Sequence, residues 1–160
     1  SVTWGKDANT DRYETTAILG MNYDESKCFW YMINGGVFDR FPNLKVYITH
    51  GGGFVPYQLG RMAQTNPNLD TYHNKKPFLS YLRNFYFDVE LHEVPMRQAM
   101  VEVIGADRVL YGSNFGGSDA VRHDLTSDLK LSQEDMDRIR WKNACELLHL
   151  DPAKIGKVGA

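Results

Sequence analysis

The chain has 160 residues, 42% of them apolar and 24% charged, which is typical of a globular protein with a normal core. Its formal net charge of -2 excludes a basic footprint for nucleic acid or anionic lipid. No apolar run approaches the roughly 18 residues of a membrane helix, and the two cysteines suggest neither a disulfide framework nor a CxxC metal site. We therefore expect one domain over residues 1–160, in the cytoplasm, with no nucleic-acid or membrane partner.

In the first half of the chain a helix is followed by a short apolar strand and a second helix. Apolar side chains at helical spacing predict a helix over Glu25–Phe38, which Pro42 prevents from continuing. The segment Leu44–Thr49 is predicted to be a strand. His50 and three glycines follow this strand directly, and a helix is expected over Val55–Gln64.

The second half repeats this alternation after a surface loop over Asn66–Pro77. We predict a strand over Asn84–Leu91, a helix over Val94–Ile104 and a third strand over Arg108–Gly112. A final helix is expected after the N-cap residue Ser132. Its predicted buried stripe consists of Met136, Ile139, Ala144, Leu147 and Leu148.

Strands that alternate with helices predict an α/β fold with a parallel sheet, in which functional groups gather at the carboxyl ends of the strands. Those ends carry His50, the segment Asp88 to His92, and Asn114, so we expect these residues around one opening. Three strands are too few for a closed barrel, which needs eight strands and about 250 residues. We therefore expect about half of a barrel, which is either part of a longer protein or paired with a complementary half.

His50 is the strongest candidate for chemistry, as a general base or a ligand held at the end of a buried strand. The alternative is a histidine bonded to a neighbouring loop, with the glycines serving only a tight turn. Gly51 to Gly53 also allow a third interpretation, a small open α/β protein that binds phosphorylated ligands through the N–H groups of the turn. The segment matches neither GxGxxG nor GxxxxGK[ST], which weakens that interpretation.

Asp88, Glu90 and His92 alternate at the end of the second predicted strand, so they share one face. Carboxylates and an imidazole in such a cluster suit a divalent metal. Polar residues at strand exits usually face water. We therefore favour the alternative, in which Asp88 pairs locally while Glu90 and His92 lie in a solvated loop.

Three stretches together resemble the carboxyl-terminal half of the amidohydrolase-related family. They are "GGVFDRFPNLKVYITHGGGFVPYQLGR" (Gly35 to Arg61), "FYFDV" with "VIGADRVLYGSNF", and "NACELLHLD" near the end. The resemblance is to the branch that contains 2-amino-3-carboxymuconate-6-semialdehyde decarboxylase and several aromatic-acid decarboxylases and hydrolases. It extends from about Asp24 to Asp151 in the family's order and spacing.

The resemblance implies a (β/α)8 barrel with one divalent metal, commonly zinc, held by an HxH pair, a third histidine and an aspartate. His50 matches the family's acid/base histidine, and Arg61 matches an arginine that grips a substrate carboxylate, in some members across a subunit interface. The chain has no HxH, and "GSNFG" places Asn114 where the family has its aspartate ligand. A neutral amide is a weaker ligand than a carboxylate, and Asp119 is a candidate substitute.

On this basis we expect a fragment or degenerate member of a metal-dependent hydrolase or decarboxylase that acts on a small carboxylated molecule. His50 would be its acid/base, Arg61 its carboxylate clamp and Asn114 a weakened metal ligand. The alternative is a non-catalytic half-barrel partner or assembly subunit. We expect a homo-oligomer or a complementary barrel half as partner, and a divalent metal, zinc above all, only where the missing half is supplied. The chain alone is expected to bind none.

Overall fold

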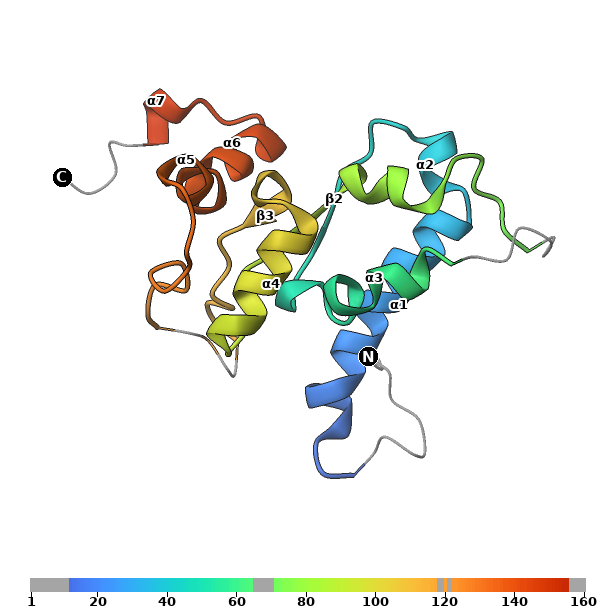
Figure 1. Cartoon of the computed structure of the whole chain (residues 1–160), viewed down its shortest axis with the longest axis horizontal. Helices are drawn as coiled ribbons and strands as arrows, with labels where there is room; N and C mark the ends of the chain where they lie inside the picture. Colours follow the sequence, from blue (N-terminus) through green and yellow to red (C-terminus); the bar gives the residue numbers. More distant parts are fainter. Residues whose placement is uncertain (1–11, 65–70, 118–119, 121, 156–160) are drawn as a thin grey trace.

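A computed structural model describes residues 12–64, 71–117, 120 and 122–155 of the chain (Figure 1). Three short strands alternate with helices, and turns labelled η are 3₁₀- or π-helical. The elements in chain order are η1 (Thr16–Gly20), α1 (Met21–Asn34), α2 (Val37–Arg40), β1 (Val46–Ile48), η2 (His50–Gly52), α3 (Val55–Met62), η3 (Phe78–Asn84), β2 (Phe85–Asp88), α4 (Val94–Ile104), η4 (Ala106–Arg108), β3 (Val109–Leu110), α5 (Gln133–Asp137), η5 (Arg138–Lys142), α6 (Asn143–Leu148) and α7 (Pro152–Ile155). No helix in these ranges is long and apolar enough to span a membrane.

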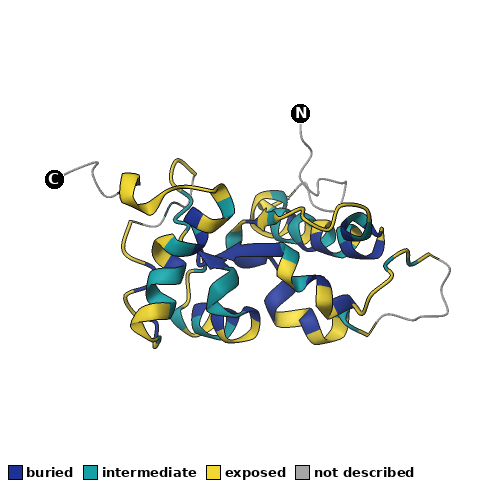
Figure 2. Cartoon of the chain, turned by 90° about the horizontal axis from the view of Figure 1, so that it is seen from above, coloured by how far each residue is buried: buried dark blue, intermediate teal, exposed yellow. Residues whose placement is uncertain are grey.

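The sheet has the order β1-β2-β3, and both pairings are parallel, which confirms the predicted α/β architecture. Val46 pairs with Phe85, and Phe87 pairs with Val109. All four residues of β2 are buried, because this central strand is covered on both faces. Figure 2 shows buried strand segments, in dark blue, in the middle of the molecule, with exposed helix faces around them. The three strands bring their carboxyl ends to the same edge of the sheet.

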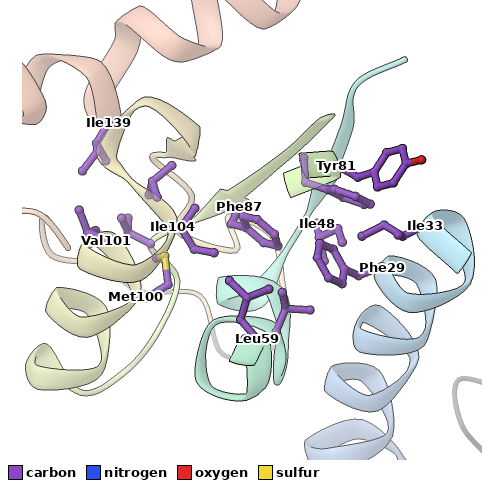
Figure 3. Close-up of a cluster of buried hydrophobic side chains, with 14 of the residues drawn as sticks. Phe29, Ile33, Ile48, Leu59, Tyr81, Phe87, Met100, Val101, Ile104 and Ile139 are labelled. Carbon is purple, nitrogen blue, oxygen red and sulfur yellow. The ribbon is translucent and has the colours of Figure 1, made fainter. Parts of the chain in front are cut away.

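The hydrophobic core joins the helices to one face of the sheet (Figure 3). Its aromatic part lies around Phe29 of α1, whose ring centroid is 4.5 Å from that of Phe85 and 6.2 Å from that of Phe87. Met100 of α4 belongs to its aliphatic part. Tyr86 lies on the other face of β2, where the Arg108 guanidinium stacks 5.0 Å from the ring centroid.

The predicted helix Glu25–Phe38 is wrong at both ends. α1 begins at Met21, after a π-helical turn, and it ends at Asn34. The chain then bends at Gly36, which has a φ of 68° and lies so close to the backbone of His73 that an added Cβ would be 2.8 Å from its carbonyl oxygen. Only glycine fits this combination of left-handed backbone and close contact. The bend separates α1 from the short α2.

The predicted N-cap of the last helix is confirmed, because the Ser132 hydroxyl accepts a hydrogen bond from the Asp135 N–H at 3.1 Å. The predicted stripe is wrong at Leu148, which is 62% exposed. The π-helical turn η5 explains the difference, because it takes about one residue more per turn than an α-helix and rotates all later residues. Asn143 and Cys145 are buried after this turn.

The same turn covers the edge of β3. The Ile139 carbonyl in η5 accepts a hydrogen bond from the Tyr111 N–H at 2.8 Å. The Asn143 amide, which is fully buried, donates to the carbonyls of Ala106 and Val109, both at 2.7 Å. These bonds satisfy backbone groups that a sheet edge would otherwise leave unpaired. β3 is thereby fixed, although it is only two residues long.

Candidate functional site

A cavity of about 570 Å³ opens at the carboxyl ends of the strands. It brings together His50 after β1, Glu90 and His92 after β2, and Asn114 after β3. The predicted convergence of strand exits around one opening is therefore confirmed for these residues. The rest of the described lining comes from α1, its preceding turn and the exits after β2 and β3: Ala17, Ile18, Met21, Asn22, Leu91, Glu93 and Gly117.

His50 lies in a tight turn over residues 49–54, which we call the His50 turn. The His50 backbone is itself left-handed, with a φ of 49°, a conformation that is uncommon outside glycine. Gly52 has a φ of 81°, and an added Cβ would overlap the ring of Phe87 in β2. Gly53 has a φ of 60°, and its Cβ would overlap the Asn22 carbonyl of α1. Packing against β2 and α1 therefore requires glycine at both positions, and it fixes the turn from two sides.

The N–H groups of the three glycines in the His50 turn are all used within the protein. Gly51 donates to a carboxylate oxygen of Asp88 at 2.9 Å, Gly52 to the Thr49 carbonyl at 2.8 Å and Gly53 to the His50 carbonyl at 3.3 Å. The three glycines are also buried. An anion would have to break these bonds to bind, so the interpretation of this turn as a phosphate-binding loop is wrong.

Asp88 is a structural support beneath the His50 turn. Besides the Gly51 N–H, its carboxylate accepts the Tyr47 hydroxyl at 2.6 Å and the Glu90 N–H at 3.2 Å. Burial raises the pKa of this carboxyl, and the three hydrogen bonds counteract the effect. Asp88 is 3% exposed and is absent from the described lining of the cavity, which confirms the expectation that it pairs locally.

The His50 imidazole lies between two carboxylates. Nδ1 is 2.6 Å from Oε1 of Glu25, and Nε2 is 3.7 Å from Oε2 of Glu90. The hydrogen bond to Glu25 and the charges of Glu25, Glu90 and Asp88 together raise the pKa of His50 to about 9, against the opposing effect of burial. At neutral pH the ring therefore carries a proton on each nitrogen. Nε2 is the nitrogen on the Glu90 side, and Glu90 lines the cavity with His50.

The expectation that Glu90 lies in a solvated loop is wrong, because its side chain is 5% exposed. The Val89 N–H donates to the Leu110 carbonyl at 3.0 Å, so parallel pairing continues past the end of β2. The strand alternation then directs Glu90 toward His50 instead of toward water. His92, two residues further on, is exposed at the cavity.

Glu25 is a site residue that the sequence analysis missed. It lies on α1, one turn before Phe29 and two turns before Ile33, so it continues the buried stripe of that helix. A carboxylate on an apolar stripe is the signal that marks it in the sequence. Its partner is 25 positions away in the chain, and only the packing of α1 against the His50 turn reveals it.

Asn114 lies in a second turn, Asn114–Gly117, which we call the Asn114 turn. Its backbone is left-handed, with a φ of 49°, and its amide lies so close to Gly117 that an added Cβ there would overlap it. Within the described ranges no group of three His, Cys, Asp or Glu side chains is placed to hold a metal ion. With a neutral amide at the ligand position, the described residues do not fit a complete mononuclear metal site. Asp119, the candidate substitute, lies outside the described residues.

Arg61 lies on α3 and is exposed. The described lining of the cavity does not include it. Leu59 on the same helix is in the core, and a residue two positions along lies on the opposite side of a helix. The structure thus brings His50 and Asn114 together and leaves Arg61 on the outer surface of the same chain, where its predicted role stays a prediction.

Comparison with known proteins gives consistent matches. Residues 31–150 match the amidohydrolase family. The chain is 31% identical over 156 residues to 2-amino-3-carboxymuconate-6-semialdehyde decarboxylase of Dictyostelium discoideum, which covers 94% of this chain and 43% of that protein. It is 29% identical over 128 residues to gamma-resorcylate decarboxylase of a Polaromonas species, covering 75% of this chain and 39% of that protein.

Solved structures share the fold. The 5-carboxyvanillate decarboxylase of Sphingomonas paucimobilis matches with a TM-score of 0.78 at 21% identity, over 89% of this chain and 45% of that one. A dihydroxybenzoic acid decarboxylase of a Polaromonas species, solved with manganese and 2-nitroresorcinol, matches with a TM-score of 0.74 at 22% identity, over 93% of this chain and 48% of that one. This chain thus spans less than half the length of these relatives. It belongs to the amidohydrolase family, in the branch of 2-amino-3-carboxymuconate-6-semialdehyde decarboxylase, and it folds as part of a (β/α)8 barrel.

Proposed function

We propose that this chain supplies the acid/base part of a decarboxylase site that acts on a small carboxylated aromatic molecule. The observation that carries the proposal is the position of His50 at the cavity, between Glu25 and Glu90, with a pKa raised to about 9. Two of its relatives are decarboxylases by name, and one of them, gamma-resorcylate decarboxylase, is named for a carboxylated aromatic substrate, which supports carboxylate loss as the reaction. We retain residues 1–160 as a single partial-barrel domain, and the free cysteines Cys28 and Cys145 support the cytoplasm as its location.

The proposed step is delivery of a proton to carbon. When the substrate loses carbon dioxide, the electron pair of the broken C–C bond stays on the ring carbon. Nε2 of His50 gives its proton to that carbon, a C–H bond forms, and the neutral imidazole regains a proton from water. A ring that is protonated at neutral pH suits this step better than hydrolysis, in which the group must first accept a proton. Glu25 and Glu90 stabilise the charged ring before transfer.

A divalent metal is part of the proposal for the complete site, with ligands that come mainly from outside the described residues. Zinc is the ion expected from the family resemblance, whereas manganese is bound in the related Polaromonas structure. We also propose that Arg61 grips a substrate carboxylate in the site of a neighbouring subunit of a homo-oligomer. Its exposure on α3, away from the described lining of its own cavity, supports action across an interface.

The test is release of carbon dioxide from 2,6-dihydroxybenzoate by the full chain, supplied in parallel with zinc and with manganese. His50→Ala is expected to lower the rate by about 100-fold or more, as removal of a general acid does. His123→Ala is the matched control, because this histidine is exposed and absent from the described lining of the cavity. Circular dichroism of both variants checks the fold. An unchanged kcat in His50→Ala would refute the assigned role.

The second candidate function is that of a non-catalytic half-barrel partner or assembly subunit. The amide at Asn114 and the lack of a three-ligand group among the described residues favour it. Size-exclusion chromatography combined with metal analysis separates the two functions. A species that binds one metal per chain and releases carbon dioxide excludes the non-catalytic function, whereas an inactive, metal-free oligomer supports it.

A further inference from the structure

We infer that Glu25 is the positioning residue of His50: its carboxylate holds the N–H of Nδ1 and thereby directs Nε2, with its proton, into the cavity. The inference rests on the proposed function, in which His50 moves a proton. Oε1 of Glu25 lies 2.6 Å from Nδ1 and also accepts the Thr49 hydroxyl at 2.5 Å. One carboxylate oxygen thus fixes both the ring of His50 and the residue before it.

The packing of α1 explains why Glu25 reaches the ring. Asn22, Glu25 and Ser26 lie three and four positions apart, so they form one face of the helix. The Ser26 hydroxyl accepts the Phe54 N–H at 2.8 Å, and the Asn22 carbonyl lies against Gly53. Both contacts hold the helix against the His50 turn. The position of Glu25 is therefore fixed by contacts that its own helix makes just before and just after it, and not by a flexible loop.

The surroundings of Glu25 are poorly suited to a carboxylate that serves only stability. Its side chain is 15% exposed, and its second oxygen, Oε2, is buried with no hydrogen-bond partner among the described residues. Placing a charge here has an energetic cost that an apolar side chain on the stripe of Phe29 and Ile33 would avoid. A buried oxygen without a hydrogen-bond partner needs a specific explanation. The role of Glu25 in holding the His50 ring in position provides one.

The arrangement assigns a different role to each carboxylate near the ring. Glu25 contacts Nδ1 from α1, Glu90 faces Nε2 from the exit of β2, and Asp88 acts on the ring from below the turn. His92 and Glu93 line the same cavity. Glu90 is 3.7 Å from Nε2, too far for a direct hydrogen bond. The Nε2 proton therefore remains available to a substrate, while the Nδ1 proton is held.

The experiment follows the ring nitrogens of His50 by NMR in the ¹⁵N-labelled full chain, without metal or substrate. The chain has five histidines, and His50→Gln identifies the signal. In the wild type we expect the neutral ring, above its pKa, to carry its proton on Nδ1. In Glu25→Gln we expect the pKa of His50 to fall by about one pH unit or more, because the charge is lost while size and an acceptor oxygen are kept.

Asp24→Asn is the matched control, since it removes the neighbouring carboxylate, which pairs with Lys27 at 2.5 Å. Its effect on the pKa of His50 should be much smaller. A neutral wild-type ring protonated on Nε2 would overturn the inference without any variant, and so would equal shifts in Glu25→Gln and Asp24→Asn. If the ring behaves as expected but His50→Ala releases carbon dioxide at the wild-type rate, the proposed function fails and the positioning by Glu25 stands.

Discussion

The two turns that face the cavity, the His50 turn and the Asn114 turn, share one backbone feature and differ in their support. Each follows a parallel strand, and each contains a polar residue, His50 or Asn114, at a φ of 49°. The His50 turn has three buried glycines packed against β2 and α1, and the N–H groups of these glycines are all bonded. In the Asn114 turn Phe115 is 98% exposed, and nothing lies within 4 Å of a Cβ built on Gly116.

This difference separates the chemistry of the site into two parts. The acid/base end is preorganised by the core of this chain, because Phe87 and Asp88 hold the turn that carries His50. In the Asn114 turn, Phe115 and Gly116 are not packed against the core in this way. A substitution in the His50 turn should therefore destabilise the protein more than the same substitution in the Asn114 turn.

The largest effect is expected from Gly52→Ala. The left-handed backbone and the overlap with Phe87 together should lower the free energy of unfolding by on the order of 3 kcal/mol. Gly116→Ala has a similar φ, 86°, and open space around the new Cβ, so about 1 kcal/mol is expected there. Urea unfolding of both variants measures the difference. Equal losses would show that packing against β2 does not support the His50 turn.

The next largest effect is a change in the stability of the protein with pH. The ordinary pKa of histidine, 6.5, is raised to about 9 in the folded protein by Glu25. A raised pKa means that the folded state binds the proton more tightly, so this stabilisation is complete below pH 6.5 and is lost as the pH rises through 9. We expect the stability of the wild type relative to His50→Gln to fall by about 1–2 kcal/mol over this window, since one pKa unit corresponds to ~1.4 kcal/mol and the ring is partly exposed. A constant difference between pH 6 and 9.5 would contradict the pairing with Glu25.

The sequence predicted those parts of the fold that depend on local patterns. The bounds of α4, Val94–Ile104, were predicted as observed, since its apolar spacing and flanking residues all lie within one element. The meeting of His50 with Asn114 followed from topology alone, because parallel strands must end at one edge. The error at Leu148 came from a π-helical turn, which leaves no clear pattern in composition.

The positions of the carboxylates around His50 could not be predicted from local patterns in the sequence. Glu90 is turned inward by one hydrogen bond from Val89 to Leu110, a partner on another strand. Glu25 reaches the ring only because α1 packs against the His50 turn. Both depend on long-range packing, and neither spacing nor propensity along the chain specifies it. The wrong interpretation of the glycine turn has the same origin, since the acceptor of the Gly51 N–H is Asp88, 37 positions away in the chain.

The smallest effect is expected from Asn114→Asp, which tests the ligand end directly. A carboxylate at this position adds a negative charge and a stronger oxygen ligand at the cavity. If the side chain faces the ligand site, the affinity for zinc or manganese should rise by about tenfold, which corresponds to ~1.4 kcal/mol. Metal content after dialysis against each ion measures it, with Asn43→Asp as a control that adds the same charge at an exposed position outside the described lining of the cavity. Unchanged metal content in Asn114→Asp would mean that the side chain at position 114 does not face the ligand site. Weak metal binding would then be a property of the Asn114 turn as a whole, and not of the ligand atom alone.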